Sequence, residues 1–293
     1  MPTSIAFHRA AILGTGLIGG SFGLALRKHF PGITIVGFDR AEVLEQAAAR
    51  GAIQERATSI PDAVRGADVV YIALPIGATL DALSAIAAAA ADHALITDSC
   101  SAKALVCKEA AIRFKQGARF LGGHPMAGKE ASEIENAAAD LFAGAPYALI
   151  APESDPDARV HEFARLLRDM GAKPVWCDPE THDWAVGIVS HLPQLVAVAL
   201  ARVVSGEMDE TGLPLTLAGK GLQDTLRLAG SPYKVWRDVF LANRENAARS
   251  LERLAQEIEH LRRNLSSKEL EEEFRAANEL FALLHQEQEK TEG

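Results

Sequence analysis

The amino-acid sequence predicts an α/β protein in which a doubly wound sheet is followed by an all-helical domain. From residue 8 to residue 177, short apolar runs alternate with alanine-rich or amphipathic stretches, as in consecutive βαβ units. Beyond residue 178 the strand signals stop and apolar residues recur at helical spacing. We therefore expect a sheet domain over residues 1–178 and a helical domain over residues 179–293.

Runs rich in β-branched and aromatic residues are expected to form the strands of the sheet. A helix over Asp157–Met170 precedes the last of them. Pro193 lies inside a later helical stretch, where a proline removes one backbone hydrogen bond and kinks the helix. The expected strands are His8–Leu13, Ile33–Phe38, Val69–Leu74, Leu95–Asp98, Phe120–Gly122, Ala148–Ile150 and Pro174–Cys177.

The composition is that of a globular protein, with 48% hydrophobic and 24% charged residues. The net charge of −9 repels nucleic acid and anionic membranes, so we expect neither as a partner. The first residues lack a secretion signal, and no apolar run reaches the roughly 20 residues that span a bilayer, which predicts a cytoplasmic protein. Cys100, Cys107 and Cys177 show no paired spacing, so we expect reduced thiols and no metal site.

A glycine-rich turn lies between the first predicted strand and the first predicted helix. Gly14 permits a tight turn, Gly16 lets the backbone approach a pyrophosphate, and Gly19 allows the helix to pack closely on the strand. The helical stretch Phe22–Lys28 follows, and its N-terminus directs N–H groups and positive potential at the phosphates. Leu17 and Ile18, within the turn, are expected to contact the cofactor. Alone, such a turn is weak evidence, and the alternative is a glycine turn without a ligand.

An acidic residue, Asp39, ends the second predicted strand, twenty residues after the last glycine of the turn. At this place in a dinucleotide site, a carboxylate accepts hydrogen bonds from the adenosine ribose. It also repels a 2′-phosphate, so we expect NAD in preference to NADP. Arg40 follows, and we expect its guanidinium to stack on the adenine.

Two later strand ends are expected to complete the cofactor cleft, because ligands of such sheets bind outside the carboxyl ends of the strands. Leu74 and Pro75 close one strand, and Asp98 closes the next. The alternative is that these are ordinary loop residues. Polar groups concentrated at a strand end favour the functional interpretation.

Two histidines are candidates for chemistry. His124 follows a predicted strand and has glycines nearby, and an imidazole with an ordinary pKa of about 6.5 can accept a proton at neutral pH. A dehydrogenase that acts on an alcohol needs such a base. The alternative for His124 is a structural role in which its ring bonds to loop carbonyls. His191, taken alone, is more typical of a buried core histidine than of a ligand contact.

One arginine is a candidate for binding an anion. Asp224 and Arg227 stand three residues apart and share one face if the segment is helical, so the acid could hold the guanidinium in place. The planar guanidinium of arginine can donate two parallel hydrogen bonds to one carboxylate. The alternative is an ordinary surface ion pair.

Taken in order, these motifs resemble the prephenate/arogenate dehydrogenase family, also called cyclohexadienyl dehydrogenases, over nearly the whole chain. No single motif is decisive, but their order is specific. The resemblance is carried by Gly14–Ser21, Asp98–Lys103, Gly123–Gly128, Ser190–Pro193, Asp224–Arg227, Trp236 and Asn243.

The resemblance implies roles that composition does not. His124 would engage the ring hydroxyl of the substrate, and Ser101 would bond with both and orient the His124 ring. Arg227 would hold a substrate carboxylate. It also implies a Rossmann-like domain that binds NAD, a helical domain through which the chain forms a homodimer, and a substrate that is prephenate or arogenate in tyrosine biosynthesis. The further substrate contacts expected are His191, Gln194, Trp236 and Asn243.

The chain departs from the family pattern at three places. Leu222-Gln223 stands where relatives often carry Phe-Arg, Gln194 where many carry histidine, and Glu133 where glycine is common. These departures leave open the polarity of the pocket and the choice between prephenate and arogenate. We expect no regulatory domain at either end.

Two other interpretations stay open at this point. A β-hydroxyacid dehydrogenase or imine reductase also joins a dinucleotide-binding domain to a helical one, but it favours a lysine late in the chain, for which Lys220 is the candidate. A catalytically silent NAD-binding protein would bind the cofactor and form no NADH with any cyclohexadienyl substrate.

Overall fold

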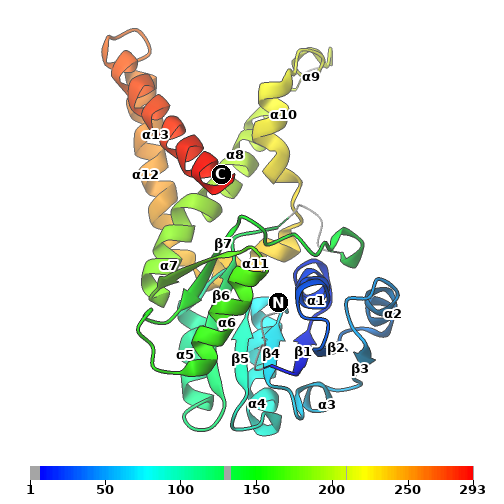
Figure 1. Ribbon diagram of the computed structural model, residues 1–293. Helices are drawn as coiled ribbons and strands as arrows, with labels where there is room; N and C mark the ends of the chain where they lie inside the picture. Colours follow the sequence, from blue (N-terminus) through cyan, green and yellow to red (C-terminus); the bar gives the residue numbers. More distant parts are fainter. Residues whose placement is uncertain (1–6, 129–132, 209, 293) are drawn as a thin grey trace.

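The structure, a computed structural model, describes residues 7–128, 133–208 and 210–292. Its centre is an eight-stranded sheet with the order β3-β2-β1-β4-β5-β6-β7-β8 (Figure 1). Neighbouring strands are parallel except β6 and β7, which are antiparallel. The strands are β1 (Arg9–Leu13), β2 (Thr34–Phe38), β3 (Glu55–Arg56), β4 (Val69–Ile72), β5 (Leu95–Asp98), β6 (Arg119–Pro125), β7 (Pro146–Ile150) and β8 (Lys173–Cys177).

Helices cover both faces of the sheet, which confirms the doubly wound class. Along β1, Ala10 and Ile12 pack into one core cluster and Ala11 and Leu13 into the other, because successive side chains of a strand point to opposite faces. Side chains of α1, α2 and α6 fill the first cluster, and side chains of α3, α4 and α5 fill the second. These helices are α1 (Leu17–His29), α2 (Ala41–Ala49), α3 (Ile60–Val64), α4 (Ile76–Ala89), α5 (Ala104–Arg113) and α6 (Ala158–Asp169), with a short 3₁₀ turn, η1 (Ile134–Asn136).

Two strands, β3 and β6, differ most from the sequence expectation. Strand β3 has two exposed residues, too few to leave an apolar signal. Strand β6 was expected to end at Gly122, since a glycine pair before His-Pro resembles a turn, but it continues to Pro125. The antiparallel partner β7 extends it, and His124 pairs with Ala148. His124 therefore lies within a strand rather than in the loop after it.

The helical part follows β8 and projects from one end of the sheet as two arms, α8 to α10 and α12 to α13 (Figure 1). A π-helical turn, η2, interrupts the first long helix just before Pro193, whose missing N–H breaks the regular hydrogen-bond ladder. The elements are α7 (Pro179–Val186), η2 (Gly187–His191), α8 (Leu192–Gly206), α9 (Leu213–Thr216), α10 (Lys220–Leu226), η3 (Arg227–Gly230), α11 (Tyr233–Ala242), α12 (Arg244–Arg263) and α13 (Glu269–Glu292).

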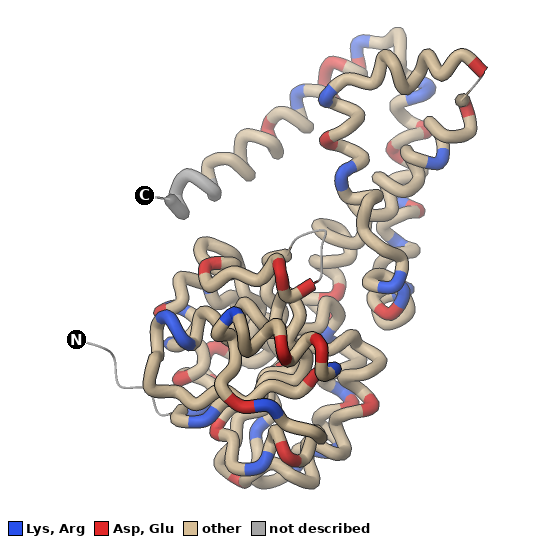
Figure 2. The backbone as a smooth tube through the Cα atoms, turned by 90° about the vertical axis from the view of Figure 1, so that its right-hand side faces the viewer, with Lys and Arg blue, Asp and Glu red and all other residues tan. Residues whose placement is uncertain are grey.

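The arms expose many large apolar side chains, unlike the sheet part. Basic and acidic residues are interspersed over both parts, as Figure 2 shows. By length and composition alone, the continuous helix Pro179–Gly206 is apolar enough to cross a membrane, and 28% of its apolar window is buried within the chain. No apolar run of this length was expected from the sequence, because the apolar stretches on either side of His191 were counted separately. Exposed apolar residues of the arms include Val198, Val203, Leu213, Leu215, Leu217, Ile258, Phe274, Leu280, Phe281, Leu283 and Leu284.

Candidate active site

The glycine turn after β1 has the geometry that a dinucleotide needs. Gly14 has φ of 88°, and a Cβ there would lie 2.3 Å from the carbonyl oxygen of Ala73. A Cβ on Gly19 would lie 1.8 Å from the carbonyl oxygen of Gly14. Helix α1 begins after Gly16, which offers no capping side chain, and its first turn contains no acidic residue. Its N-terminal N–H groups and positive potential therefore suit a pyrophosphate.

Substitution of Gly19 should disturb this turn directly. We expect Gly19→Ala to weaken NAD binding by about 10-fold or more, since the added methyl group forces the Gly14 carbonyl to move. Gly32→Ala is the control, because no atom lies within 4 Å of a Cβ placed there. A calorimetric titration with NAD measures both variants. Equal affinity of the Gly19 variant and the parent would show that the close contact is not needed.

Asp39 stands at the end of β2, beside the glycine turn. Its Oδ2 accepts a hydrogen bond from the Thr15 N–H at 2.7 Å, and its Oδ1 accepts from the Arg40 N–H at 2.7 Å. The carboxylate thereby holds the turn in place. Two carboxylate oxygens provide about four acceptor positions, so Asp39 retains capacity for ribose hydroxyls. Arg40 is exposed and precedes α2.

The segment after β4 borders the same turn. A Cβ on Gly14 would lie 3.1 Å from Cδ2 of Leu74, and the Leu74 carbonyl accepts a hydrogen bond from the Thr79 hydroxyl at 3.1 Å. Pro75 is exposed and precedes helix α4. The structure therefore places Leu74 beside the glycine turn, as the cofactor prediction requires.

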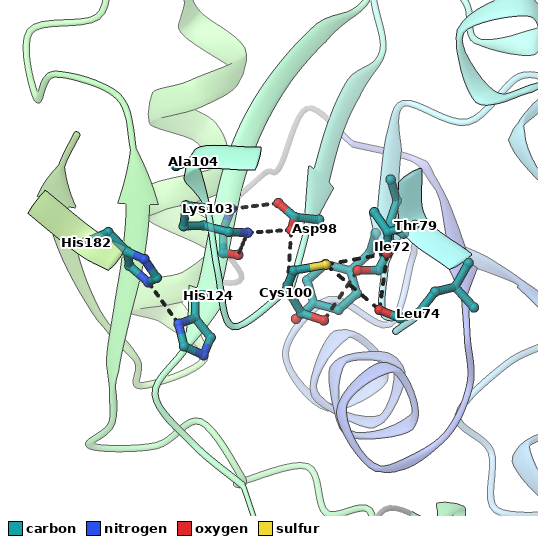
Figure 3. A network of polar contacts seen from close by, with 12 residues as sticks. Ile72, Leu74, Thr79, Asp98, Cys100, Lys103, Ala104, His124 and His182 are labelled. Atoms are coloured by element: carbon teal, nitrogen blue, oxygen red, sulfur yellow. Dashed lines mark hydrogen bonds and ion pairs between the residues drawn. The ribbon is translucent and has the colours of Figure 1, made fainter. Parts of the chain in front are cut away.

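Asp98, predicted as a cofactor contact, instead points into the protein. Its Oδ1 accepts from the Gly123 N–H at 3.1 Å, and its Oδ2 accepts from the Cys100 N–H at 3.1 Å and from Nζ of Lys103 (Figure 3). Both side chains of the Asp98–Lys103 pair are fully buried. Asp98 is fully buried and already accepts three hydrogen bonds, so its carboxylate supports strand β6 just before His124.

Lys103 completes this support and was not singled out in the sequence. Its Nζ also donates to the Gly123 carbonyl at 2.6 Å. Burial, the largest single effect, lowers the pKa of Lys103, but the charge and hydrogen bond of Asp98 together with the neighbouring thiols Cys100 and Cys107 outweigh it, and the pKa is raised. The lysine therefore stays charged, as a buried ion pair requires. A lysine five residues after a buried strand's terminal acid was the available signal.

His124 meets a second histidine that the sequence analysis missed. Nδ1 of His124 lies 2.9 Å from Nε2 of His182 (Figure 3). Nδ1 of His182 lies 2.8 Å from Oδ1 of Asp183. All three residues are buried. Ser101 is half-buried after β5 and makes no hydrogen bond with His124 among the described contacts, so its orienting role stays a prediction. The residue that bonds the His124 ring is His182.

The predicted pocket residues of the helical part gather around the same network. The amide of Asn243 donates to the Asp183 carbonyl at 2.6 Å and contacts Nδ1 of His191 at 3.2 Å. The indole of Trp236 stands perpendicular to the His191 ring, with ring centroids 6.0 Å apart. His191, Trp236 and Asn243 therefore form one cluster, and Asn243 joins that cluster to Asp183.

Two buried polar atoms of this cluster lack partners among the described residues. They are Nε2 of His191 and Oε1 of Gln194, three residues apart along the helix. Asn243 donates to Nδ1 of His191, so the neutral ring carries its proton on Nε2 and can donate it. Buried polar groups are normally hydrogen-bonded. One donor and one acceptor are thus available to a polar ligand.

Arg227 belongs to a different element from the histidine network. It is exposed at the start of η3, and η3 packs against α8, which carries Gln194. The predicted support of its guanidinium by Asp224 stays a prediction. Leu222 and Gln223, the departures from the family pattern, lie nearby on α10. Glu133, the third departure, is exposed before η1.

The described residues offer no metal centre. No group of three or more histidine, cysteine or acidic side chains within residues 7–128, 133–208 and 210–292 could hold an ion. Cys100, Cys107 and Cys177 are free thiols. Burial, the largest cause, raises the pKa of the Cys107 thiol to about 12, so this thiol stays protonated at neutral pH.

The buried histidines predict an acid-sensitive fold. Burial lowers the pKa of His124 well below 6.5, with the charges of His182 and Lys103 adding to the shift, and burial lowers the pKa of His191 to about 4. Both rings bind protons more weakly in the folded chain than in the unfolded chain. Their contribution to stability is therefore complete above about pH 6.5 and is lost as pH falls toward the folded-state pKa values.

Urea unfolding at a series of pH values measures this effect. We expect the unfolding free energy to fall between about pH 7 and about pH 5, with a smaller decrease in a His124→Asn variant, which lacks one of the two rings. Equal pH slopes in the parent and the variant would show that His124 is not buried in its neutral form.

Comparison with known proteins agrees with this geometry. The family model "Prephenate dehydrogenase, nucleotide-binding domain" matches residues 22–176, and the family model "Prephenate dehydrogenase, dimerization domain" matches residues 178–285. The prephenate dehydrogenase of Bacillus subtilis (strain 168) is 34% identical over 266 residues, which cover 90% of this chain and 72% of that protein.

Solved structures with the same architecture include prephenate dehydrogenase from A. aeolicus in complex with hydroxyphenyl propionate and NAD⁺. It has a TM-score of 0.86 and 29% identity, and the match covers 97% of this chain and 99% of that one. Synechocystis arogenate dehydrogenase has a TM-score of 0.78 and 28% identity, with 95% and 99% covered. Both family models and the curated relative agree, and the chain belongs to the prephenate dehydrogenase family.

Proposed function

We propose that this chain catalyses the NAD-dependent oxidative decarboxylation of prephenate to 4-hydroxyphenylpyruvate in tyrosine biosynthesis. The observation that carries the proposal is the buried, neutral His124, which a strand of the sheet part supplies and the helical part holds through His182. Family membership supports the reaction, and the A. aeolicus relative was solved with NAD⁺ and hydroxyphenyl propionate.

The two parts of the chain are proposed to have different roles. We propose a cofactor domain over residues 1–178 and a substrate and dimerisation domain over residues 179–293. Strand β8 ends at Cys177, and Asp178 caps α7 by accepting a hydrogen bond from the Thr181 N–H at 2.8 Å. The change from sheet to helix at this residue supports the proposed boundary.

NAD fits the residues of the first domain. Gly14, Gly16 and Gly19 with the first turn of α1 would hold the pyrophosphate, and Asp39 would hold the adenosine ribose. Leu17, Ile18, Leu74 and Pro75 would border the cofactor, and Arg40 would stack on its adenine. When bound, NAD supplies the acceptor for a hydride. Asp98 is assigned to the support of β6, as its contacts favour.

In the mechanism, the residues of the chain bind the substrate and move one proton. Nε2 of His124 accepts the proton of the ring hydroxyl as the hydride leaves the same carbon. Loss of the carboxylate as carbon dioxide makes the ring aromatic, and the proton returns to the phenolate oxygen, so no net proton is gained. Because aromatisation drives the step, the protein acts mainly by positioning and polarising the substrate.

The helical domain would bind the two acidic groups of the substrate. Arg227 would hold one carboxylate, and Nε2–H of His191 would donate to a substrate oxygen. Trp236 and Asn243 would fix the His191 ring, and Gln194 would line the pocket. Ser101, after β5, would contact the reacting end of the substrate.

We further propose that the chain acts in the cytoplasm as a homodimer. The apolar side chains exposed on α8 and α13 are more numerous than a monomer normally exposes, and the matched model of this region is described as a dimerization domain. The occupant proposed for these faces is a second copy of the chain. The net charge of −9 supports a small-molecule substrate over nucleic acid.

The alternative substrate is arogenate, which carries an ammonium group where prephenate carries a keto group. The structural similarity to Synechocystis arogenate dehydrogenase supports this alternative. The test measures NADH formation with each substrate, and then repeats the better one with NADP. We expect prephenate with NAD to have the highest kcat/KM. A higher value with arogenate would reverse the assignment, and no turnover with either would leave only cofactor binding.

A further inference from the structure

His124 is the first member of a chain of three buried side chains that crosses from the sheet part to the helical part. His124 belongs to β6, while His182 and Asp183 belong to α7. The His124 and His182 rings meet edge to face with centroids 5.1 Å apart, which suits a bond between ring nitrogens (Figure 3). All three residues are buried, and the atoms that join them find their partners inside the protein.

Asp183 is the fixed end of this chain. Its Oδ1 accepts the Lys103 N–H at 2.7 Å and its Oδ2 accepts the Ala104 N–H at 2.9 Å, at the start of helix α5. Burial alone would raise the pKa of Asp183, but the hydrogen bonds from His182 and from these two N–H groups outweigh it, and the pKa is lowered. Asp183 is therefore ionised and can only accept hydrogen bonds.

The ionised carboxylate determines where the protons lie. Nδ1 of His182 must donate to Asp183, and in a neutral His182 ring, which has a single N–H, Nε2 then keeps its lone pair. Nδ1 of His124 must then donate to that lone pair. The neutral His124 ring consequently has its own lone pair on Nε2, on the side of the ring away from His182 (Figure 3). With both rings neutral, each bond in the chain has one permitted direction.

We propose that His182 and Asp183 are positioning residues that hold His124 in the tautomer with a protonated Nδ1 and an Nε2 ready to accept the substrate's proton. The proposal deepens the proposed function and rests on it. Free histidine in water prefers the other neutral tautomer, whose Nε2 carries the proton and cannot act as a base. The relay through His182 therefore determines whether His124 can take part in the reaction.

Asp183 supplies the negative charge that stabilises the protonated form of His124. His191 on η2 and Lys103 before α5 face His124 and disfavour a positive charge, and Lys103 is itself paired with Asp98 of β5. Asp183 is the carboxylate that hydrogen-bonds toward His124, through His182. When the hydroxyl proton reaches Nε2, the positive ring can share its Nδ1 proton with His182, and the Asp183 carboxylate stabilises the result.

Two substitutions of His182 separate positioning from packing. In His182→Asn, the amide nitrogen replaces Nδ1 and keeps the bond to Asp183, but no atom reaches His124. In His182→Gln, the longer amide can still accept from Nδ1 of His124. We expect His182→Asn to lower kcat by about 10- to 100-fold and His182→Gln by less than about 10-fold, with KM for prephenate nearly unchanged in both. His161→Asn, on α6, is the control.

The direct readout is the ¹⁵N resonance of the histidine rings in the NAD-bound protein, which distinguishes a protonated ring nitrogen from an unprotonated one. The His124 signal is identified by its absence in His124→Asn. We expect the parent and His182→Gln to carry the proton on Nδ1, and His182→Asn to carry it on Nε2. A parent protein with the proton on Nε2, or a His182→Asn variant with parental kcat, would overturn the proposal.

This measurement stands apart from the proposed function, since it needs no substrate. If the parent forms no NADH with prephenate but has His124 protonated on Nδ1, the relay stands and the function fails. If His182→Asn does not fold, the tautomer of the parent still decides the proposal. Kinetics with kcat and KM both parental in all His182 variants would contradict positioning whatever the resonances show.

Discussion

Replacing His124 by asparagine is expected to lower kcat by about 10²- to 10⁴-fold, the range that general base catalysis supplies. The asparagine amide nitrogen would occupy the place of Nδ1 and could still donate to His182, but nothing would remain at the place of Nε2. The structure puts this ring at the end of the His182–Asp183 relay, where it is buried and neutral. Loss of the base should therefore affect turnover rather than binding.

Steady-state kinetics with prephenate and a separate titration with NAD distinguish the two effects. NAD affinity should stay within about 2-fold of the parent, because His124 lies on β6 and the glycine turn follows β1. His161→Asn serves again as a histidine outside the relay. Parental turnover in His124→Asn would remove this residue from the mechanism.

Replacing Arg227 by alanine is expected to raise the KM for prephenate by about 10- to 100-fold while kcat changes little. A guanidinium can form two parallel bonds to a carboxylate, and their loss removes binding that is equally strong in the ground state and the transition state. The residue is exposed at the start of η3, which packs against α8. Its side chain is therefore accessible to a ligand that enters from the solvent.

Arg227→Lys separates the contribution of the positive charge to substrate binding from that of the planar guanidinium geometry. The lysine keeps the positive charge but loses the planar fork, so its KM should fall between those of the parent and Arg227→Ala. If the alanine variant has a KM within error of the parent, the guanidinium does not bind the substrate. A decrease in kcat with unchanged KM would assign Arg227 to the transition state instead.

Much of the sheet could be predicted because its signals are local. Strands such as β1 and β4 are continuous apolar runs buried on both faces, and the loops that separate them carry glycine or proline. Strand β3 was missed because two exposed residues carry no pattern, and β6 was predicted too short because its last part is defined by pairing with β7. Pairing between segments distant in sequence leaves no local signal.

The site was predicted in part, for the same reason. His124, His191, Trp236 and Asn243 could be named from motifs, and the structure joins them through Asp183. His182 and Asp183 themselves lie in a short helix where a polar pair looks like a solvated face. Only the contact of α7 with β6 and α5 shows that they are buried.

At Asp98 the sequence favoured a ligand contact where the structure shows an internal support. An acid at the carboxyl end of a parallel strand is well placed for a ligand, so the sequence favoured a cofactor contact. The structure shows the carboxylate turned inward to Lys103 and to backbone N–H groups. The apolar helix Pro179–Gly206 also shows a limit of local pattern. The sequence could not show that the face with His191 and Gln194 is buried while other apolar side chains stay exposed.

The central claim is that this site moves a hydride from the hydroxyl-bearing ring carbon of prephenate to NAD while carbon dioxide leaves. The most direct measurement uses prephenate labelled with deuterium at that carbon and follows the label, the NADH and the carbon dioxide together. The account predicts deuterated NADH, carbon dioxide and 4-hydroxyphenylpyruvate in equal amounts. Unlabelled NADH, or binding of NAD without any NADH from prephenate or arogenate, would contradict it.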